Sequence, residues 1–299
     1  ATMTTVEATQ YVENISAQML QLVDDVEDDT IRSGATRGQL SAIAGVVATK
    51  VLRYTLQLYF VKDDLSKLPA RPDSTAILFE LEGHFFSICA AHTYGDVTPD
   101  QVGVMINDEF ISFGGDLRIY EPNDIEDHDP QKIDLAVWEL TSETAAALKQ
   151  KYLFLPWEKI DTHHPPVTFA AYLIAGYPAS ITSKHFPTKT IFPKPLTLAT
   201  IGKPADFYMR EQLNPDHFLA VEGTQAKVAD LKTGIPTSLP PLDGLSGSGI
   251  WHVHSLSEKE PNFSLVGILT GENADQTVLF ATKLNGLRRM LVSDFEVSL

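Results

Sequence analysis

The chain has 299 residues, of which 43% are hydrophobic and 21% are charged. This composition is typical of one large or two small globular domains. Its formal net charge of −16 at pH 7 opposes binding to nucleic acid or to anionic membrane surfaces. No apolar run approaches the roughly 18 residues that cross a bilayer, so we expect neither a nucleic-acid nor a membrane partner.

The number of cysteines is informative about the cellular compartment. Cys89 is the single cysteine, which rules out an intramolecular disulfide. Together with the lack of a recognisable signal peptide in the sequence given, this favours a reducing, cytoplasmic location. Cys89 lies in a strand-like run and is expected to pack as a small hydrophobe.

The sequence predicts helices in the first segment of the chain. Apolar residues recur at helical spacing over residues 5–28, and a second helical pattern covers residues 37–53. We interpret residues 1–52 as a helical N-terminal extension, which could also serve as a docking surface for a regulatory partner.

The periodicity then changes to that of strands. Residues 54–61 are rich in β-branched and aromatic side chains. Two further strand-like runs, 75–81 and 84–89, flank Glu82 and Gly83. A two-residue connection that contains glycine predicts a β-hairpin.

Two ionisable residues stand at the ends of apolar runs. His92 follows the second hairpin strand after two alanines, and Asp134 opens the strand-like run 133–140. Each alone is most simply an ordinary partly buried histidine or an exposed strand-end acid. A buried role for Asp134 requires a partner, because an unpaired buried carboxylate is costly.

The second half of the chain is also strand-rich. A boundary is predicted after Pro165, at the end of a proline-flanked connection. Many short strands separated by proline and glycine predict an all-β barrel or sandwich. The expected strands are 167–175, 189–192, 196–201, 217–221, 249–254, 263–270 and 277–281, followed by a helix over 285–291.

The run Gly244-Leu245-Ser246-Gly247-Ser248-Gly249 stands out in this half. It is either a flexible Gly/Ser linker or a sharp turn that exposes a serine nucleophile beside main-chain N–H groups. The chain order His92, Asp134, Ser246 is that of a chymotrypsin-like triad. An α/β-hydrolase would have its serine first and glycine in place of Ser248.

At this point the chain resembles the trypsin-like (chymotrypsin-fold) serine peptidases. Residues 89–92 resemble that family's Thr-Ala-Ala-His motif, and residues 134–137 its Asp-Ile-Ala-Leu motif. Residues 244–249 resemble Gly-Asp-Ser-Gly-Gly-Pro. Residues 175–178 and 266–270 resemble the start of the second barrel and the cleft-lining strand. The likeness spans roughly residues 54–299.

The resemblance implies an all-β fold of two antiparallel six-stranded barrels with the site between them. The expected first barrel covers residues 53–165, and the second covers 166–299 with a C-terminal helix. Residues 1–52 lie outside the resemblance.

The resemblance also implies a serine endopeptidase that acts on proteins or peptides. Ser246 would be the nucleophile, His92 the general base and Asp134 its orienting carboxylate. Main-chain N–H groups of Gly244 and Ser246 would form the oxyanion hole, and Thr270 would support Asp134. The alternatives are a catalytically silent or partner-activated module that binds a peptide or protein, and an esterase with the same triad.

Departures from the family pattern matter for activation and specificity. Leu245 stands where secreted members carry an aspartate that pairs with a new N-terminus, so we expect no activation by N-terminal cleavage. Pro240, Gly271 and Glu272 fall at the expected substrate pocket. An uncharged Pro240 favours small or apolar side chains over Lys or Arg, whereas Glu272 argues the other way.

We expect no cofactor and no metal. His252 and His254 alternate on one strand and could bind a metal, but no further ligand lies at suitable spacing nearby. The acidic loop around Asp124 lacks the glycine and closing glutamate of an EF-hand.

Overall fold

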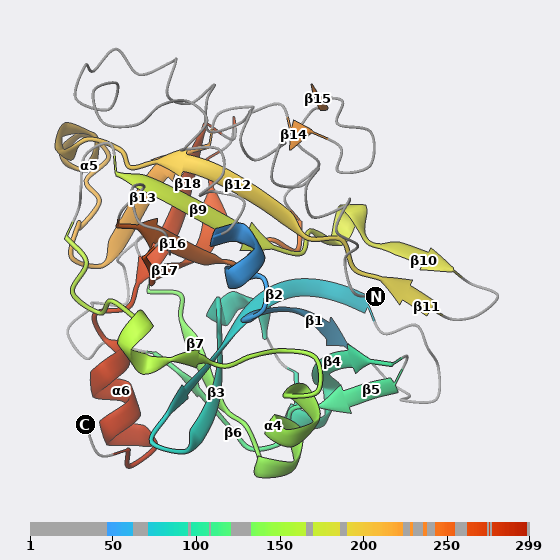
Figure 1. Ribbon diagram of the computed structural model, residues 1–299. Helices are drawn as coiled ribbons and strands as arrows, with labels where there is room; N and C mark the ends of the chain where they lie inside the picture. The colour runs from blue at the N-terminus through green and yellow to red at the C-terminus, as the bar shows by residue number, and fades with distance from the viewer. Residues whose placement is uncertain are drawn as a thin grey trace.

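The computed structural model describes residues 47–61, 71–94, 97–107, 109–120, 133–165, 170–185, 190–223, 228–229, 236–237, 243–254, 262–273, 275 and 277–297. Predictions for residues 1–46, for the acidic loop around Asp124 and for Pro240 lie outside this part of the chain. The described residues are mostly β, in two antiparallel main sheets that form the lower and upper halves of Figure 1. The expected class of two antiparallel barrels is thereby confirmed.

The first sheet comes from the first half of the chain. Its strand order is β5-β4-β1-β2-β3-β7-β6, with the short β8 added in parallel to β2. The strands are β1 (Thr55–Phe60), β2 (Arg71–Leu81), β3 (His84–Cys89), β4 (Val102–Ile106), β5 (Glu109–Ser112), β6 (Asp116–Ile119), β7 (Ala136–Glu139) and β8 (Leu155–Pro156).

Hydrogen bonding divides this sheet into eight strands, so the expected number of six is wrong. One of the two additional strands is the short β8, and the other results from a break between β5 and β6, where Gly114 and Gly115 have φ values of 57° and 71°. Such angles are favourable for glycine and interrupt a strand. β5 pairs with β4 and β6 with β7, at opposite ends of the strand order. Because only three residues separate β5 from β6, the sheet must curl until its ends meet.

The predicted hairpin at the centre of this sheet is present. β2 and β3 pair in antiparallel register from Ile77–Ile88 to Leu81–His84. Glu82 and Gly83 between them both have positive φ, 50° and 86°. This is the pattern of a two-residue turn whose twist matches the flanking strands.

The second sheet has six strands, as expected, in the order β12-β9-β16-β17-β18-β13. They are β9 (Ala171–Gly176), β12 (Leu196–Ile201), β13 (Phe218–Glu222), β16 (Gly249–Val253), β17 (Phe263–Glu272) and β18 (Val278–Lys283). Each was predicted within a few residues, because each apolar run is bounded by proline, glycine or a polar loop.

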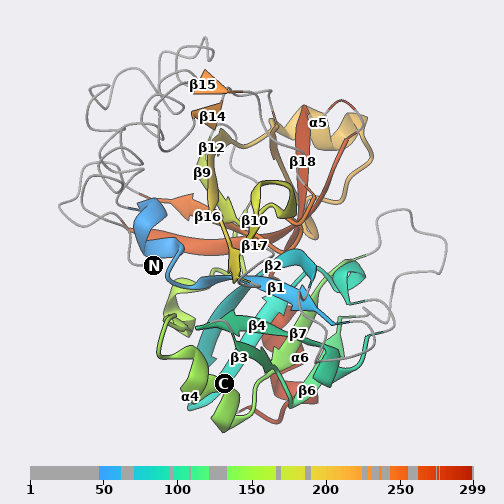
Figure 2. The ribbon, with the colours of Figure 1, turned by 90° about the vertical axis from the view of Figure 1, so that its right-hand side faces the viewer.

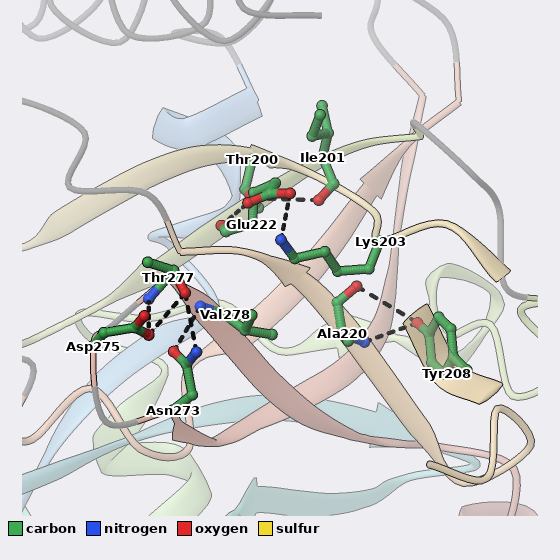
Figure 3. A network of polar contacts seen from close by, with 10 residues as sticks. All are labelled: Thr200, Ile201, Lys203, Tyr208, Ala220, Glu222, Asn273, Asp275, Thr277 and Val278. Atoms are coloured by element: carbon green, nitrogen blue, oxygen red, sulfur yellow. Dashed lines mark hydrogen bonds and ion pairs between the residues drawn. The ribbon is translucent and has the colours of Figure 1, made fainter. Parts of the chain in front are cut away.

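The two ends of the second sheet also meet. A single bridge joins Gly202, just after β12, to Val221 of β13. Thr200 donates its hydroxyl to the carbonyl of Glu222 at 2.5 Å, and the Glu222 carboxylate pairs with Lys203 (Figure 3). These contacts close the second barrel at β12 and β13.

The remaining elements are short. Two small hairpins lie beside the second sheet, β10 (Ser183–His185) with β11 (Thr190–Phe192) and β14 (Val228–Ala229) with β15 (Pro236–Thr237). The helices are α4 (Ser142–Leu148), α5 (Ala205–Arg210) and α6 (Leu287–Asp294). Short 3-10 turns are η1 (Ala91–Thr93), η2 (Pro99–Gln101), η3 (Trp157–Lys159) and η4 (Ala179–Ile181).

The largest apolar core joins the two sheets. It contains side chains from β2 and β3 of the first sheet and from β9, β16 and β17 of the second. Helix α6 follows the second sheet in the chain but lies against the first, as Figures 1 and 2 show. Its continuation brings Phe295 edge-on to Phe86, with ring centroids 5.4 Å apart.

The end of the expected N-terminal extension belongs to this same core. Residues 47–51 are helical, and Val47, Ala48 and Val51 are fully buried in it. Across the described ranges, no helix combines the length and the apolarity needed to cross a membrane.

Candidate active site

The structure brings His92 and Asp134 into direct contact. His92 lies in η1, after β3, and Asp134 lies two residues before β7. The ring Nδ1 of His92 is 2.5 Å from Oδ2 of Asp134, and the main-chain N–H of His92 donates to Oδ1 at 2.8 Å. Both carboxylate oxygens therefore hold one histidine. A proton on Nδ1 leaves Nε2 as the free basic nitrogen.

Neighbouring residues orient the carboxylate. Ile133 and Leu135 are buried on either side of Asp134. The main-chain N–H of Asp134 donates to the hydroxyl of Thr282 on β18, at 3.3 Å. Thr270, the expected support, instead donates its hydroxyl to the carbonyl of Phe280 at 3.3 Å. No sequence pattern indicates the contact between Asp134 and Thr282, because it depends on how the two sheets meet.

Electrostatics favour the protonated form of His92. Its hydrogen bond to Asp134 raises the pKa above the ordinary 6.5, against the opposing effect of partial burial. The charges of Asp134 and of Asp73 on β2 raise the pKa further. Asp73 is thus a second carboxylate in the surroundings of His92, and no sequence motif marks it.

The Gly/Ser run is a fixed turn that leads into β16. Gly244 and Gly247 have φ values of +86° and +84°, which other residues rarely adopt. A side chain at Gly244 would lie 2.6 Å from the main-chain nitrogen of Ala179. One at Gly247 would overlap the carbonyl oxygen of Thr75. The flexible-linker interpretation is wrong for residues 243–249, since neighbouring main chain encloses them.

Thr75 of β2 holds this turn from the first sheet. Its N–H donates to the carbonyl of Ser246 at 2.9 Å, and its hydroxyl donates to the carbonyl of Gly244 at 3.1 Å. The same hydroxyl accepts the N–H of Tyr177 at 2.9 Å. Thr75 therefore joins the predicted hairpin to the Gly/Ser turn, a role that its position in an ordinary strand did not indicate.

The second half of the chain holds the turn at two other points, one in η4 and one on β17. The N–H of Ala179, in η4, donates to the carbonyl of Asp243 at 2.7 Å. The N–H of Gly247 donates to the carbonyl of Leu269 on β17 at 2.8 Å. The turn is thus held by both sheets.

The two serines of the turn differ in access. Ser248 is fully buried, and its hydroxyl has no hydrogen-bond partner among the described residues. Ser246 is half-buried. Burial leaves Ser246 as the serine of this turn that a substrate could reach.

The Gly/Ser turn approaches the segment that carries His92 through Gly247 and Cys89. A side chain at Gly247 would approach the sulfur of Cys89 to 2.5 Å, and Cys89 contacts Thr93 beside His92. Within the described part of the chain, the Ser246 hydroxyl makes no hydrogen bond to the His92 ring. In the same ranges, the N–H groups of Gly244 and Ser246 donate to no main-chain carbonyl.

Cys89 itself is a buried thiol. It donates to the carbonyl of Thr75 at 3.0 Å. Burial raises its pKa to about 12, only partly offset by hydrogen bonds to Thr93 and Ser74. Cys89 therefore packs as a neutral side chain and is no nucleophile at neutral pH.

The predicted pocket residues that the structure describes lie at the exposed end of β17. Gly271 and Glu272 are both exposed, and a side chain added at Gly271 would meet nothing within 4 Å. The following turn is held by Asn273, whose side chain bonds the N–H of Val278 at 2.8 Å and the Thr277 hydroxyl at 3.0 Å (Figure 3). These two bonds join the end of β17 to the start of β18.

The His252 and His254 pair belongs to a histidine cluster. The His252 ring lies 4.7 Å from that of His164 and 4.5 Å from that of His254, between ring centroids. Burial is the main reason that the pKa of His252 falls to about 4. Among residues with described positions, no group of three or more His, Cys, Asp or Glu is arranged to hold a metal ion.

Comparisons with known proteins give only a likeness of fold. No protein-family model matches the chain, and no curated protein matches it. Among solved structures, Vibrio cholerae VesB protease is similar with 12% identity and a TM-score of 0.47, over 81% of this chain and 64% of VesB. The atomic-resolution structure of HBP is similar with 13% identity and a TM-score of 0.48, over 83% of this chain and 93% of HBP.

The chain thus spans about 64% of the length of VesB protease. Because both identities and both TM-scores are low, the assignment of a site depends on the geometry of this chain alone.

Proposed function

We propose that this protein is a serine endopeptidase with Ser246 as nucleophile. The observation that supports it best is the two-point contact of His92 with Asp134, next to a Gly/Ser turn that both sheets hold. Asp134 keeps the imidazole in the tautomer whose Nε2 can accept a proton. A buried Ser248 and a buried Cys89 leave Ser246 as the nucleophile of this region.

The chemistry requires a proton acceptor because a serine hydroxyl is a weak nucleophile at neutral pH. As the Ser246 oxygen bonds to the peptide carbonyl carbon, its proton passes to Nε2 of His92. Asp134 stabilises the resulting imidazolium. The C–N bond then breaks, and His92 gives the proton to the leaving amine. Water, deprotonated by His92, attacks the acyl-enzyme carbonyl. The ester C–O bond then breaks, and His92 returns the proton to the Ser246 oxygen as the acid leaves.

Negative charge develops on the carbonyl oxygen during both attacks. We assign the N–H groups of Gly244 and Ser246 as its donors. Loss of one such donor typically costs about 100- to 1,000-fold in rate. A pocket at the end of β17, beside Gly271 and Glu272, would receive the side chain before the cleaved bond. The uncharged Pro240, whose position is not described, supports a preference for small or apolar residues through its place in the sequence.

Fluorophosphonate labelling tests this proposal, since the reagent bonds to an activated serine hydroxyl. The wild type should be labelled on Ser246 and Ser246→Ala should not. Ser248→Ala is the matched control in the same turn and should label normally, because its buried hydroxyl is unused. A wild type that takes up no label would refute the enzyme and leave the silent, peptide-binding module.

A further inference from the structure

We propose that Leu245 is a positioning residue whose burial presets the turn before Ser246 in the intact chain. No new N-terminus is then needed to order the site. This inference rests on the proposed function, and it concerns how the N–H groups of the proposed oxyanion hole are held in position.

Leu245 is anchored in the core of the second sheet. It is 1% exposed and belongs to the apolar cluster inside that sheet. Its neighbours in the cluster include Ile174, Ile250, Val266, Leu269 and Leu279. A carboxylate in this apolar surrounding would need a cationic partner, because burying an unpaired charge is costly. A leucine needs none, since removing its side chain from water is itself favourable.

The peptide bonds on either side of Leu245 are fixed by hydrogen bonds. In a trans peptide the carbonyl and the N–H point in opposite directions. Ala179 holds the carbonyl of Asp243 at 2.7 Å, so the N–H of Gly244 points away from Ala179. Ser248 holds the carbonyl of Leu245 at 3.0 Å, which turns the N–H of Ser246 away from Ser248.

Leu245 links these two amides. Thr75 holds the carbonyl of Gly244 at 3.1 Å, which fixes the peptide between Gly244 and Leu245. Three consecutive peptides are therefore held by their carbonyls, and the side chain of Leu245 ties them to the core. With their N–H groups free of main-chain acceptors in the described residues, Gly244 and Ser246 can donate to a substrate oxygen.

The described residues just before β1 are packed against the core. Val47, Ala48 and Val51 are fully buried, and the Thr55 hydroxyl bonds the carbonyl of Val51 at 2.8 Å. The chain runs from this helical turn straight into β1. Residues 47–51 thus add to the core as part of the same continuous segment as β1.

The test uses the intact 299-residue chain, checked by mass spectrometry, and the same chain after limited proteolysis before residue 47. Fluorophosphonate labelling should proceed at similar rates in both. Leu245→Ala should lower the labelling rate on the order of 100-fold, the size of losing one oxyanion donor. Leu245→Met should restore it to within a few-fold.

Leu219→Ala is the matched control. Leu219 is also 1% exposed and lies in the same cluster, on β13. It loses the same atoms from the same core, so it should label within a few-fold of wild type under conditions where circular dichroism shows each variant folded. In the Leu245 variant the loss should fall on the bond-forming rate constant and not on reagent affinity.

Each other result has a definite meaning. Labelling that appears only after cleavage would retain the serine peptidase and overturn the inference. Equal losses in Leu245→Ala and Leu219→Ala would also overturn it, because a general loss of packing would then explain the effect. No labelling before or after cleavage would refute the proposed function, and the inference with it.

Discussion

Thr75, on β2 of the first sheet, and Ser246, in the turn before β16 of the second, are joined by a hydrogen bond of 2.9 Å from the N–H of Thr75 to the carbonyl of Ser246. The bond places the central strand of the first sheet against the turn that precedes β16 of the second. The arrangement of the candidate site therefore depends on how the two sheets pack.

The Thr75 hydroxyl should contribute both to stability and to activity. Thr75→Val keeps the size of the side chain but removes the bonds to Gly244 and Tyr177. Each lost hydrogen bond costs about 1 kcal/mol of unfolding free energy, measurable by urea denaturation. We expect labelling of Ser246 to fall roughly 10-fold, equivalent to about 1.4 kcal/mol. Thr75→Ser keeps the hydroxyl and should label normally; equal labelling of the two variants would contradict this.

Gly247 should tolerate no side chain, and Gly83 provides a matched comparison. Both have positive φ, +84° and +86°. At Gly83 an added methyl group meets nothing within 4 Å, whereas at Gly247 it would overlap Thr75. Gly83→Ala should cost only backbone strain, about 1–2 kcal/mol. Gly247→Ala should be more destabilising in thermal unfolding and should abolish labelling; similar melting temperatures would show that the turn is not confined.

The pH dependence of activity should report His92. The histidine must be neutral to accept the serine proton, and its hydrogen bond to Asp134 raises its pKa above 6.5. Activity should therefore be lost as pH falls through a value above 6.5. Asp73→Asn removes a charge that raises this pKa, so the acid limb of kcat/KM should move to lower pH. An unmoved limb would place the Asp73 charge too far away to act.

Asp134→Asn should reduce activity far more than Asp73→Asn. It removes the carboxylate that orients the imidazole, and changes of this kind typically reduce the rate by about 10⁴-fold. Turnover of a peptide substrate and labelling of Ser246 should fall together. Circular dichroism should show an unchanged fold, and retention of most of the activity would remove Asp134 from the proposed triad.

The histidine cluster should weaken the fold in acid. Burial and the nearby His164 and His254 lower the pKa of His252 from 6.5 to about 4, against the charge of Asp161. Because the unfolded chain binds the proton more readily, this part of the stability is complete above pH 6.5 and falls as pH drops toward 4. Burial also lowers the pKa of His164, and the nearby charge of Lys283 lowers it further.

His252→Phe tests this contribution, because the ring is kept while the titration is removed. Between pH 7 and pH 4 the variant should lose less unfolding free energy than the wild type. The difference should be on the order of 1 kcal/mol once solvent screening of this half-buried ring is allowed for. His163→Asn, at an exposed residue of the same segment, should lose as much as the wild type. The prediction would fail if His252→Phe also lost as much unfolding free energy as the wild type between pH 7 and pH 4.

Cys89 should be unreactive in the folded protein. Its thiol is buried and its pKa is raised to about 12. Iodoacetamide at pH 8 should modify it only after denaturation in guanidinium chloride, as mass spectrometry can show. Rapid modification of the native chain would contradict the packing described around Thr75.

Much of the local structure was predictable because its causes are local. The strand-like runs 75–81 and 84–89 around Glu82-Gly83 predict the hairpin of β2 and β3, and short apolar runs bounded by proline and glycine predict the second sheet. The residue types at His92, Asp134 and Ser246 indicate a hydrolase through their order and immediate neighbours. The break at Gly114 and Gly115 was missed, since two glycines do not reveal which strands lie on either side.

The sequence alone determined the strand pattern, the order of the candidate residues and the replacement of an acid by Leu245. Only the tertiary structure decided that His92 meets both oxygens of Asp134, that Ser248 is buried, and that Leu245 lies in the core. Thr75 bonds Gly244 across 169 residues of chain. Contacts at that separation arise when two sheets bury a common apolar core, and no periodicity within either segment encodes them.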